Sequence, residues 1–300
     1  VTITPKTLTP TSADIILSGS DLQDDGKGNY SYVYDGTEKK PVVTIKDGTV
    51  KVPASEYTVT YSNNKNVGTA TVTITSNEGG NYTFAEQTVN FAITSATAQL
   101  TSSPQAKDLT YTGQAQELVT VGSAEGGHIE YLQDDGTYSP NIPKETRAGT
   151  YIVTYKVKGD GNHESTAPSQ VSVTIKPKEI INPKVTVTGA YTYDGTPKEP
   201  ADADIEVKDG AITIPSNEYT AAFRDNTEAG TATVIITSVN GSNYIINAEG
   251  TFTIGKADAA GTAPTGKTGL PYNGTAQELV TAGSASGGTM VYSLSETGEY

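Results

Sequence analysis

Histidine is the side chain that most readily exchanges protons near neutral pH, and this chain has only two, His128 and His163. No Gly-x-Ser-x-Gly elbow accompanies them, and the absence of cysteine removes thiolate chemistry. His163 also stands where two related segments have Tyr82 and Tyr244, so its ring is expected to serve in packing or in a turn. The sequence therefore predicts no catalytic residue and a protein that is not an enzyme.

Residues 21–30 hold the nearest approach to a set of calcium ligands. An EF-hand loop needs a glycine at its sixth position and a bidentate glutamate at its twelfth. Counting from Asp21, Gly26 supplies the glycine, but the twelfth residue is Tyr32. The segment therefore predicts a lengthened hairpin, with an irregular cation site or a partner site as the alternative, and no metal ligand is assigned.

Glycine-rich stretches could cradle a phosphate if they completed a nucleotide-binding loop. Gly26-Lys27-Gly28 and Gly159-Asp160-Gly161 both lack the third glycine of a dinucleotide loop, and no Walker sequence occurs. We therefore expect no cofactor-binding residue and no cofactor.

Eighteen tyrosines against four phenylalanines could form a platform on which sugar rings stack. Most of them recur at strand or turn positions, as Tyr57 and Tyr219 do. There the ring is expected to pack while the hydroxyl reaches a backbone group. Carbohydrate binding stays open as an alternative.

The formal net charge of −14 repels phosphate backbones and anionic membrane surfaces. No run of about 18 apolar residues is present, so no membrane insertion is expected in this segment. Nucleic-acid and membrane partners are therefore not expected, whereas a glycan or a host or cell-surface protein stays open as a partner.

All these side chains are set in a repeated framework. The phrase LTYTGQAQELVTVGSAEGG at Leu109 returns as LPYNGTAQELVTAGSASGG at Leu270, and YDGTEKKP at Tyr34 returns as YDGTPKEP at Tyr193. The order is A, B, A′, B′, and both chain ends are expected to be cut inside the repeat. The predicted segments are the end of a preceding module at 1–3, module A at 4–93, module B at 94–175, module A′ at 176–254 and an incomplete module B′ at 255–300.

Hydrophobic periodicity predicts strands throughout. Tyr57, Val59 and Tyr61 alternate with polar residues, and the closing segment around Phe91 and Ile93 does the same. Asp-Gly, Asn-Gly and Gly-Gly pairs between such runs are typical of tight turns. We predict an all-β, elongated tandem array of small antiparallel, immunoglobulin-like β-sandwich modules with almost no helix, and β-grasp-like modules as the alternative.

The junctions between modules are short and contain proline. Thr4-Pro5-Lys6 precedes module A, and Lys176-Pro177-Lys178 precedes A′. Because proline fixes φ, such linkers limit swivelling between neighbours. A monomeric rod is expected.

The repeated residues also carry a family resemblance. The Tyr-Asp-Gly-Thr openings at 34–37 and 193–196, the Gly-Thr-Ala-Thr-Val strand and the Gly-Asn-Tyr turn at 80–82 resemble the YDG and MBG type repeats of large exported bacterial surface proteins. Module B is similar to the companion repeats that alternate with them. The resemblance implies an extracellular location, on a bacterial surface or secreted, and it carries over no catalytic residue.

Together these features predict a non-catalytic stalk or spacer that presents a distal functional domain. One alternative is an adhesin module in which loops 122–127 and 283–288 bind a carbohydrate or host protein. Another is the accessory region of a secreted polysaccharide-degrading enzyme.

Overall fold

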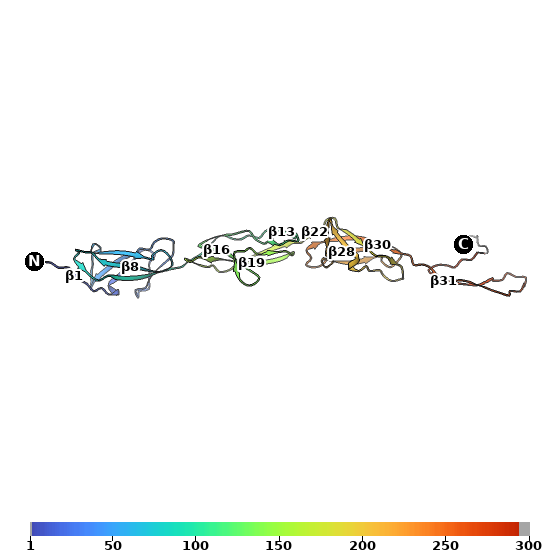
Figure 1. The fold of residues 1–300 in the computed structure, drawn as a ribbon, viewed down its shortest axis with the longest axis horizontal. Helices are drawn as coiled ribbons and strands as arrows, with labels where there is room; N and C mark the ends of the chain where they lie inside the picture. The colour runs from blue at the N-terminus through green and yellow to red at the C-terminus, as the bar shows by residue number, and fades with distance from the viewer. Residues whose placement is uncertain (1, 294–300) are drawn as a thin grey trace. The chain divides into compact units, whose positions relative to one another are not determined.

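A computed structural model describes residues 2–293 of the chain (Figure 1). Its contacts divide the chain into two units, each of which is described by itself. The first unit comprises Val1–Leu109, Gly113–Thr146 and Thr150–Ile175, and the second comprises Thr110–Thr112, Arg147–Gly149 and Lys176–Tyr300. Two short loop segments of module B thus belong to the same unit as module A′.

Module A is a sandwich of a larger and a smaller sheet. The larger sheet has the order β3-β4-β10-β8-β7 and the smaller one β2-β5-β6, while the short strand β1 pairs with β9. The strands are β1 (Lys6–Thr7), β2 (Ile15–Ser18), β3 (Gln23–Asp24), β4 (Tyr30–Val33), β5 (Val42–Asp47), β6 (Val50–Lys51), β7 (Tyr57–Ser62), β8 (Gly68–Ser76), β9 (Tyr82–Thr83) and β10 (Gln87–Thr94).

The alternation in the sequence becomes the core of this sandwich. Ala70, Val72 and Ile74 of β8 are fully buried, and the threonines between them are more exposed. Ile45 of β5 enters the same core from the smaller sheet. The valine and isoleucine side chains contribute about 1.5–3 kcal/mol each when they are fully buried, so the core accounts for the packing of the two sheets.

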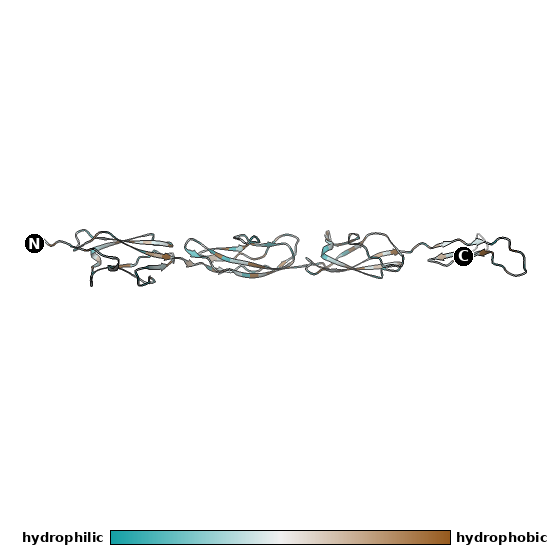
Figure 2. Cartoon of the chain, turned by 90° about the horizontal axis from the view of Figure 1, so that it is seen from below, coloured by the Kyte–Doolittle hydropathy of each residue, from teal (hydrophilic) through white to brown (hydrophobic). Residues whose placement is uncertain are grey.

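Module B is built around a five-stranded sheet of order β13-β21-β19-β16-β17, flanked by the pairs β12-β15, β14-β18 and β11-β20. Its strands are β11 (Ala96–Thr97), β12 (Gln99–Ser102), β13 (Leu109–Thr110), β14 (Gln116–Glu117), β15 (Ser123–Glu125), β16 (Gly127–Leu132), β17 (Tyr138–Ser139), β18 (Lys144–Glu145), β19 (Gly149–Gly159), β20 (His163–Glu164) and β21 (Ser169–Lys176). The hydrophobic residues, brown in Figure 2, lie along strands here and in module A.

Module A′ repeats the plan of module A with a four-stranded sheet of order β24-β30-β28-β27 and a smaller sheet β23-β25-β26, while β22 pairs with β29. Its strands are β22 (Lys178–Glu179), β23 (Lys184–Val187), β24 (Tyr191–Thr192), β25 (Ile205–Asp209), β26 (Ile212–Ile214), β27 (Tyr219–Arg224), β28 (Gly230–Ser238), β29 (Tyr244–Ile245) and β30 (Asn247–Gly255).

The described part of module B′, residues 255–293, forms two-stranded ribbons. Strand β31 (Ala260–Thr262) pairs with β34 (Ser284–Ser286), as β12 pairs with β15, and β32 (Thr265–Gly266) pairs with β33 (Val280–Thr281). Tyr272 and Leu279 are exposed.

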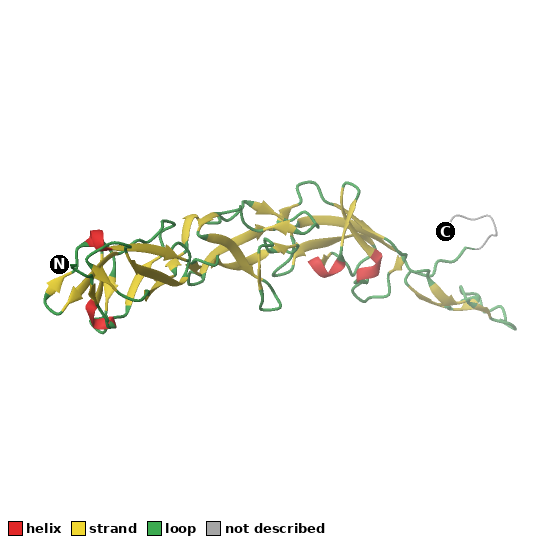
Figure 3. Ribbon diagram, turned by 60° about the vertical axis from the view of Figure 1, so that its left-hand side comes forward, coloured by secondary structure: helices red, strands yellow, loops and turns green. Residues whose placement is uncertain are grey.

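The prediction of an all-β chain of tandem sandwich modules is confirmed. Among residues 2–293 the helical elements are single 3₁₀ turns, red in Figure 3: Ser12–Asp14, Ala54–Glu56, Asp202–Asp204 and Ser216–Glu218. No helix in that range is long and apolar enough to cross a membrane.

The sheets are not purely antiparallel, which corrects one detail of the prediction. Strand β4 runs parallel to β10, and β24 runs parallel to β30. Between β4 and β10 the chain crosses to the smaller sheet and returns, and a crossover of this kind allows parallel pairing where a tight hairpin does not.

Candidate functional site

The two histidines lie on different strands of module B and have different partners. His163, at the start of β20, places Nδ1 2.8 Å from Asp160 Oδ1, and its ring meets Tyr34 in a T-shaped contact. His128, on β16, is largely exposed, with Nε2 3.4 Å from a Glu130 oxygen. The ring of His163 therefore packs in a turn, as its place in the repeat predicted.

Residues 21–30 form the lengthened hairpin that the sequence predicted. Strands β3 and β4 pair antiparallel and add a fifth strand to the larger sheet of module A. The Asp25 carboxylate accepts hydrogen bonds from Lys27 N, Asn29 N and Asn29 Nδ2, and Asp24 accepts one from Gly26 N. These acidic side chains thus organise the turn itself. Across residues 2–293, no group of three or more acidic or histidine side chains is placed to hold a metal ion.

The segment 122–127 is largely strand and not a free loop, since β15 and the first residue of β16 occupy most of it. Gly122 and Gly127 lie where the backbone of a neighbouring segment leaves no room for a side chain: a Cβ would come within 2.5 Å of Ser102 O at Gly122 and 2.1 Å of Lys158 O at Gly127. Close packing within module B therefore explains these glycines. In the copy at 283–288, Gly283 meets Thr262 O in the same way.

The recurring tyrosines act as the sequence predicted. Tyr57 is buried and donates its hydroxyl hydrogen to Val43 O over 3.0 Å, and Tyr219 donates to Ile205 O over 3.3 Å. Each bond ties the larger sheet to the smaller one. These two rings are consequently part of the fold and are not available for stacking on a sugar.

A different set of repeated residues comes together where one module follows another. In the first unit, the Val67 amide donates to the side-chain oxygen of Asn162 over 2.9 Å. Beside this bond, His163 meets the ring of Tyr34 with 5.2 Å between centroids and 86° between ring planes. Strand β20 also pairs in parallel with the linker strand β11. The Val67 bond, a second bond from Asn162 Nδ2 to Asn66 Oδ1 at 3.4 Å and the aromatic contact join module B to module A, while the β11–β20 pair fixes the start of module B against its own turn.

The second unit contains the same arrangement. The Ala148 amide donates to the side-chain oxygen of Asn243 over 2.8 Å, and Tyr111 meets Tyr244 with 5.2 Å between centroids and 78° between planes. The linker strand β22 pairs in parallel with β29. In both units the amide and the asparagine are 95 residues apart, so the contact recurs with the repeat.

A buried carboxylate fixes the asparagine in module A′. Glu218 is 5% exposed and accepts hydrogen bonds from Ser242 Oγ at 2.8 Å, Asn243 N at 2.7 Å and Asn243 Nδ2 at 2.7 Å. Burial raises the pKa of Glu218, but the hydrogen bonds from Asn243 and Ser242 and the charge of Arg147 outweigh it, so the pKa lies below its usual 4.5. The backbone N–H and the side-chain Nδ2 of Asn243 therefore both point to Glu218, and the side-chain oxygen Oδ1 is left to accept the Ala148 amide.

Module A contains the same clamp, whereas module B uses a shorter one. Glu56 accepts Asn81 N at 2.6 Å and Asn81 Nδ2 at 3.0 Å. These two bonds, with the side-chain bond first, lower the pKa of Glu56. In module B, Asp160 accepts Asn162 N at 2.7 Å and holds His163 from the same oxygen.

The opposite side of each contact is built from a Tyr-x-Gly turn, Tyr34-Asp35-Gly36 in module A and Tyr111-Thr112-Gly113 in module B. In module A, Asp35 Oδ1 accepts Thr37 N at 2.9 Å and Thr37 Oγ1 at 2.7 Å, and Asp35 Oδ2 pairs with Lys39. Lys39 N in turn donates to Asn64 O at 2.7 Å, and Asn64 Nδ2 donates to Lys39 O at 2.8 Å. This network ties the tyrosine of the turn to the loop that ends in Val67.

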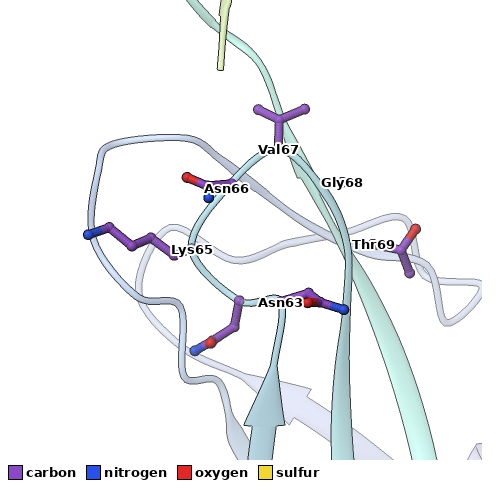
Figure 4. Close-up of a pocket in the computed structure, with 7 residues that line it drawn as sticks. Asn63, Lys65, Asn66, Val67, Gly68 and Thr69 are labelled. Atoms are coloured by element: carbon purple, nitrogen blue, oxygen red, sulfur yellow. The ribbon is translucent and has the colours of Figure 1, made fainter. Parts of the chain in front are cut away.

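That loop presents its amide because a glycine follows it. Gly68 has φ of 142°, Gly149 158° and Gly230 146°, a region that favours glycine. Figure 4 shows the loop in module A, where residues 63–69 line a small hollow and Val67 stands at the tip beside Asn66. The X-Gly-Thr motif therefore exposes the amide of residue X to the neighbouring module.

The sequence shows the Tyr-Asp-Gly-Thr openings, the Gly-Thr-Ala-Thr-Val strand and the Gly-Asn-Tyr turn as separate features of one module. It does not reveal that they meet between modules, and the clamping glutamates Glu56 and Glu218 were missed. The usable signal was the constant spacing of 95 residues, which joins Val67 to Asn162 and Ala148 to Asn243.

Comparison with known proteins finds no matching family model and no matching curated protein. Among solved structures, the chain is similar to Sidekick-1 immunoglobulin domains 1–5, at 12% identity and a TM-score of 0.31; the match covers 81% of this chain and 59% of that one. It is also similar to Dpr2 Ig1-Ig2 in complex with DIP-Theta Ig1-Ig3, at 10% identity and a TM-score of 0.29, covering 81% and 99%. Likeness at this level adds nothing to the fold described above.

Proposed function

We propose that this chain is a non-catalytic structural repeat region, a stalk or spacer, of a bacterial cell-surface or secreted protein that presents a distal functional domain. The observation that carries the proposal is the recurring contact between an X-Gly-Thr amide and a clamped asparagine, flanked by an aromatic pair. Each repeat carries the residues that contact the next module, which suits a spacer whose length depends on the number of repeats.

The structural roles of the residues that recur in the repeat support the same proposal. The residues that recur hold turns, sheets and junctions: Asp35 and Asp194 organise turns, and Glu56 and Glu218 clamp asparagines. Of the residues first considered for catalysis or metal binding, His163, Asp24 and Asp25 are engaged in packing or turns, and His128 lies largely exposed on β16. The resemblance of the Tyr-Asp-Gly-Thr motifs to YDG and MBG type repeats supports an exported, extracellular setting, and the charge of −14 suits a soluble surface projection.

Two measurements test this proposal. Nuclear-spin relaxation of the isotope-labelled chain should give one common, strongly anisotropic tumbling for residues 4–254, and Asn162→Ala together with Asn243→Ala should separate it into independently tumbling modules. Antibodies against residues 4–254 should label intact cells that produce the full protein. Independent tumbling in the unsubstituted chain, or specific glycan binding by the folded chain, would favour a binding module over a spacer.

A further inference from the structure

We propose that the Asn81-Tyr82 turn of module A is a docking surface for a B-type module placed directly before residue 1 in the same polypeptide. That module would supply an X-Gly-Thr amide and the tyrosine of its Tyr-x-Gly turn. The inference rests on the proposed function, because it extends the same junction to an end of module A that has no neighbour among the described residues.

The turn is already in its docking conformation. Glu56 holds Asn81 N and Asn81 Nδ2, just as Glu218 holds the equivalent atoms of Asn243. The side-chain oxygen of Asn81 receives no hydrogen bond from residues 2–293, whereas the oxygen of Asn243 accepts the Ala148 amide. The carboxylate therefore orients an acceptor whose donor is not among the described residues.

The exposed fractions of the equivalent residues in module A′ show how much of the turn a docked neighbouring module covers. Asn243 is 3% exposed and Tyr244 is 8% exposed, with Tyr111 packed on the same core. Asn81 is exposed and Tyr82 is only half-buried, although Glu56 holds Asn81 through the same two donors. The difference corresponds to the loops that cover the turn of module A′ and are absent over module A.

The strand that leads into module A identifies a B-type neighbour. Strand β1 pairs in parallel with β9, with Lys6 opposite Tyr82, as β22 pairs with β29 with Lys178 opposite Tyr244. Lys6 pairs with Asp47, as Lys178 pairs with Asp209. The sequence Val-Thr-Ile-Thr-Pro-Lys at 1–6 also matches Val-Thr-Ile-Lys-Pro-Lys at 173–178, which closes module B.

Charge favours the same neighbour. The residue before the donating amide is Arg147 in module B, whereas it is Asn66 in module A, and Glu228 stands at that place in module A′. The positive charge of Arg147 helps to lower the pKa of Glu218. A B-type module would bring such an arginine toward Glu56, whereas an A-type module would bring either a neutral asparagine or a second carboxylate, and neither supplies the attraction.

The test adds one module to the intact chain. Residues 94–172 are placed directly before Val1, so that Val1-Thr2-Ile3 completes the closing strand of the added module, which alone carries isotope label. Its amide equivalent to Ala148 should exchange with solvent roughly five- to tenfold more slowly than in the same protein with Asn81→Ala. Because Asn81 is exposed, the variant should fold, and unchanged exchange at Ile74 checks this.

The chain without the added module is the control that distinguishes failure of the docking surface from failure of the junction itself. There, Ala148 should exchange more slowly than in Asn243→Ala. If Ala148 is protected but its added counterpart exchanges equally fast with and without the Asn81→Ala substitution, the docking surface is refuted and the junction stands. If Ala148 is not protected either, the junction is refuted as well.

Discussion

Modules A and A′ are two copies of one fold whose ends are exposed to different degrees. Their cores correspond position by position: Ile74 in β8 and Ile236 in β28 are both fully buried. Their asparagine clamps correspond as well, with Glu56 on Asn81 and Glu218 on Asn243. Yet Asn81 is exposed while Asn243 is buried. The comparison teaches that a clamping glutamate does not by itself bury the asparagine, whereas Ala148 and Tyr111 of the neighbouring module lie against the end of module A′.

The copies also differ at one edge. In module A the hairpin β3-β4 extends the larger sheet to five strands, while in A′ the short strand β24 forms the edge of four. Tyr32 and Tyr191 nevertheless occupy equivalent places, each meeting a phenylalanine of the closing strand at 5.6 Å and 5.2 Å. An edge strand can therefore be lengthened without disturbing the core behind it.

The largest expected effect tests whether the two cores are equivalent. Ile74→Ala and Ile236→Ala should each lower the free energy of unfolding of their module by about 2–5 kcal/mol, because both side chains are fully buried. Urea unfolding read by amide exchange in each module measures this. Ile→Val at the same positions is the control, at about 0.5–1.5 kcal/mol. A loss below about 1 kcal/mol at one position only would show that the cores pack differently.

The carboxylate clamps should respond unequally. Glu218→Gln replaces one acceptor with a donor beside Ser242 and Asn243, so module A′ should lose about 1.5–3 kcal/mol of stability. Glu56→Gln should cost less, since water can reach Asn81. Thermal unfolding checks both, with the exposed Glu228→Gln as a control. Equal losses in the two modules would contradict the role given to burial.

The asparagines themselves give the next contrast. Asn243→Ala removes the acceptor for Ala148 and the Nδ2 donor to Glu218, while the backbone N–H of residue 243 remains, so a loss of about 1–3 kcal/mol is expected. Asn81→Ala in this chain should be milder, because the side chain is exposed and contacts no preceding module. Chemical denaturation measures both variants. A larger loss for Asn81→Ala would overturn the comparison.

Acid should weaken both copies alike. Hydrogen bonds from Lys39 and Thr37 hold the pKa of Asp35 well below its usual 3.8, and Lys198 and Thr196 do the same for Asp194. Because the folded pKa values are depressed, their stabilisation is complete above about pH 5. It is lost progressively as pH falls through the unfolded values toward the folded ones.

Unfolding at a series of pH values between 6 and about 2 tests this expectation. Asp35→Asn should flatten the pH dependence in module A, and Asp194→Asn should flatten it in A′. A variant whose pH dependence matches that of the unsubstituted chain would show that the turn aspartate is not linked to folding.

The smallest effect concerns the added hairpin. Asp25→Ala removes three hydrogen bonds within an exposed turn, so amides at Lys27 and Asn29 should exchange several times faster. Ile74 should exchange as before, because the hairpin lies at the sheet edge. Loss of protection at Ile74 would show that the edge supports the core after all.

Much of the fold follows from the sequence alone. The period-two pattern around Tyr57, Val59 and Tyr61 encodes which face of a strand is buried, and glycines such as Gly36 mark turns with positive φ. Both are local properties, so one copy can be interpreted without the rest of the chain. Repetition then supplies the number and order of the modules.

Other features depend on tertiary structure. The parallel pairing of β4 with β10, and the bond from Val67 to Asn162, join residues far apart in sequence. Their geometry depends on where the fold places two loops, which no local pattern records. The clearest case is the exposure of Asn81 against the burial of Asn243, because both asparagines are held by a glutamate but only Asn243 has a neighbouring module against it. The sequence by itself therefore determined the strands, turns and repeats, and the packing of one module against the next decided which asparagine is covered.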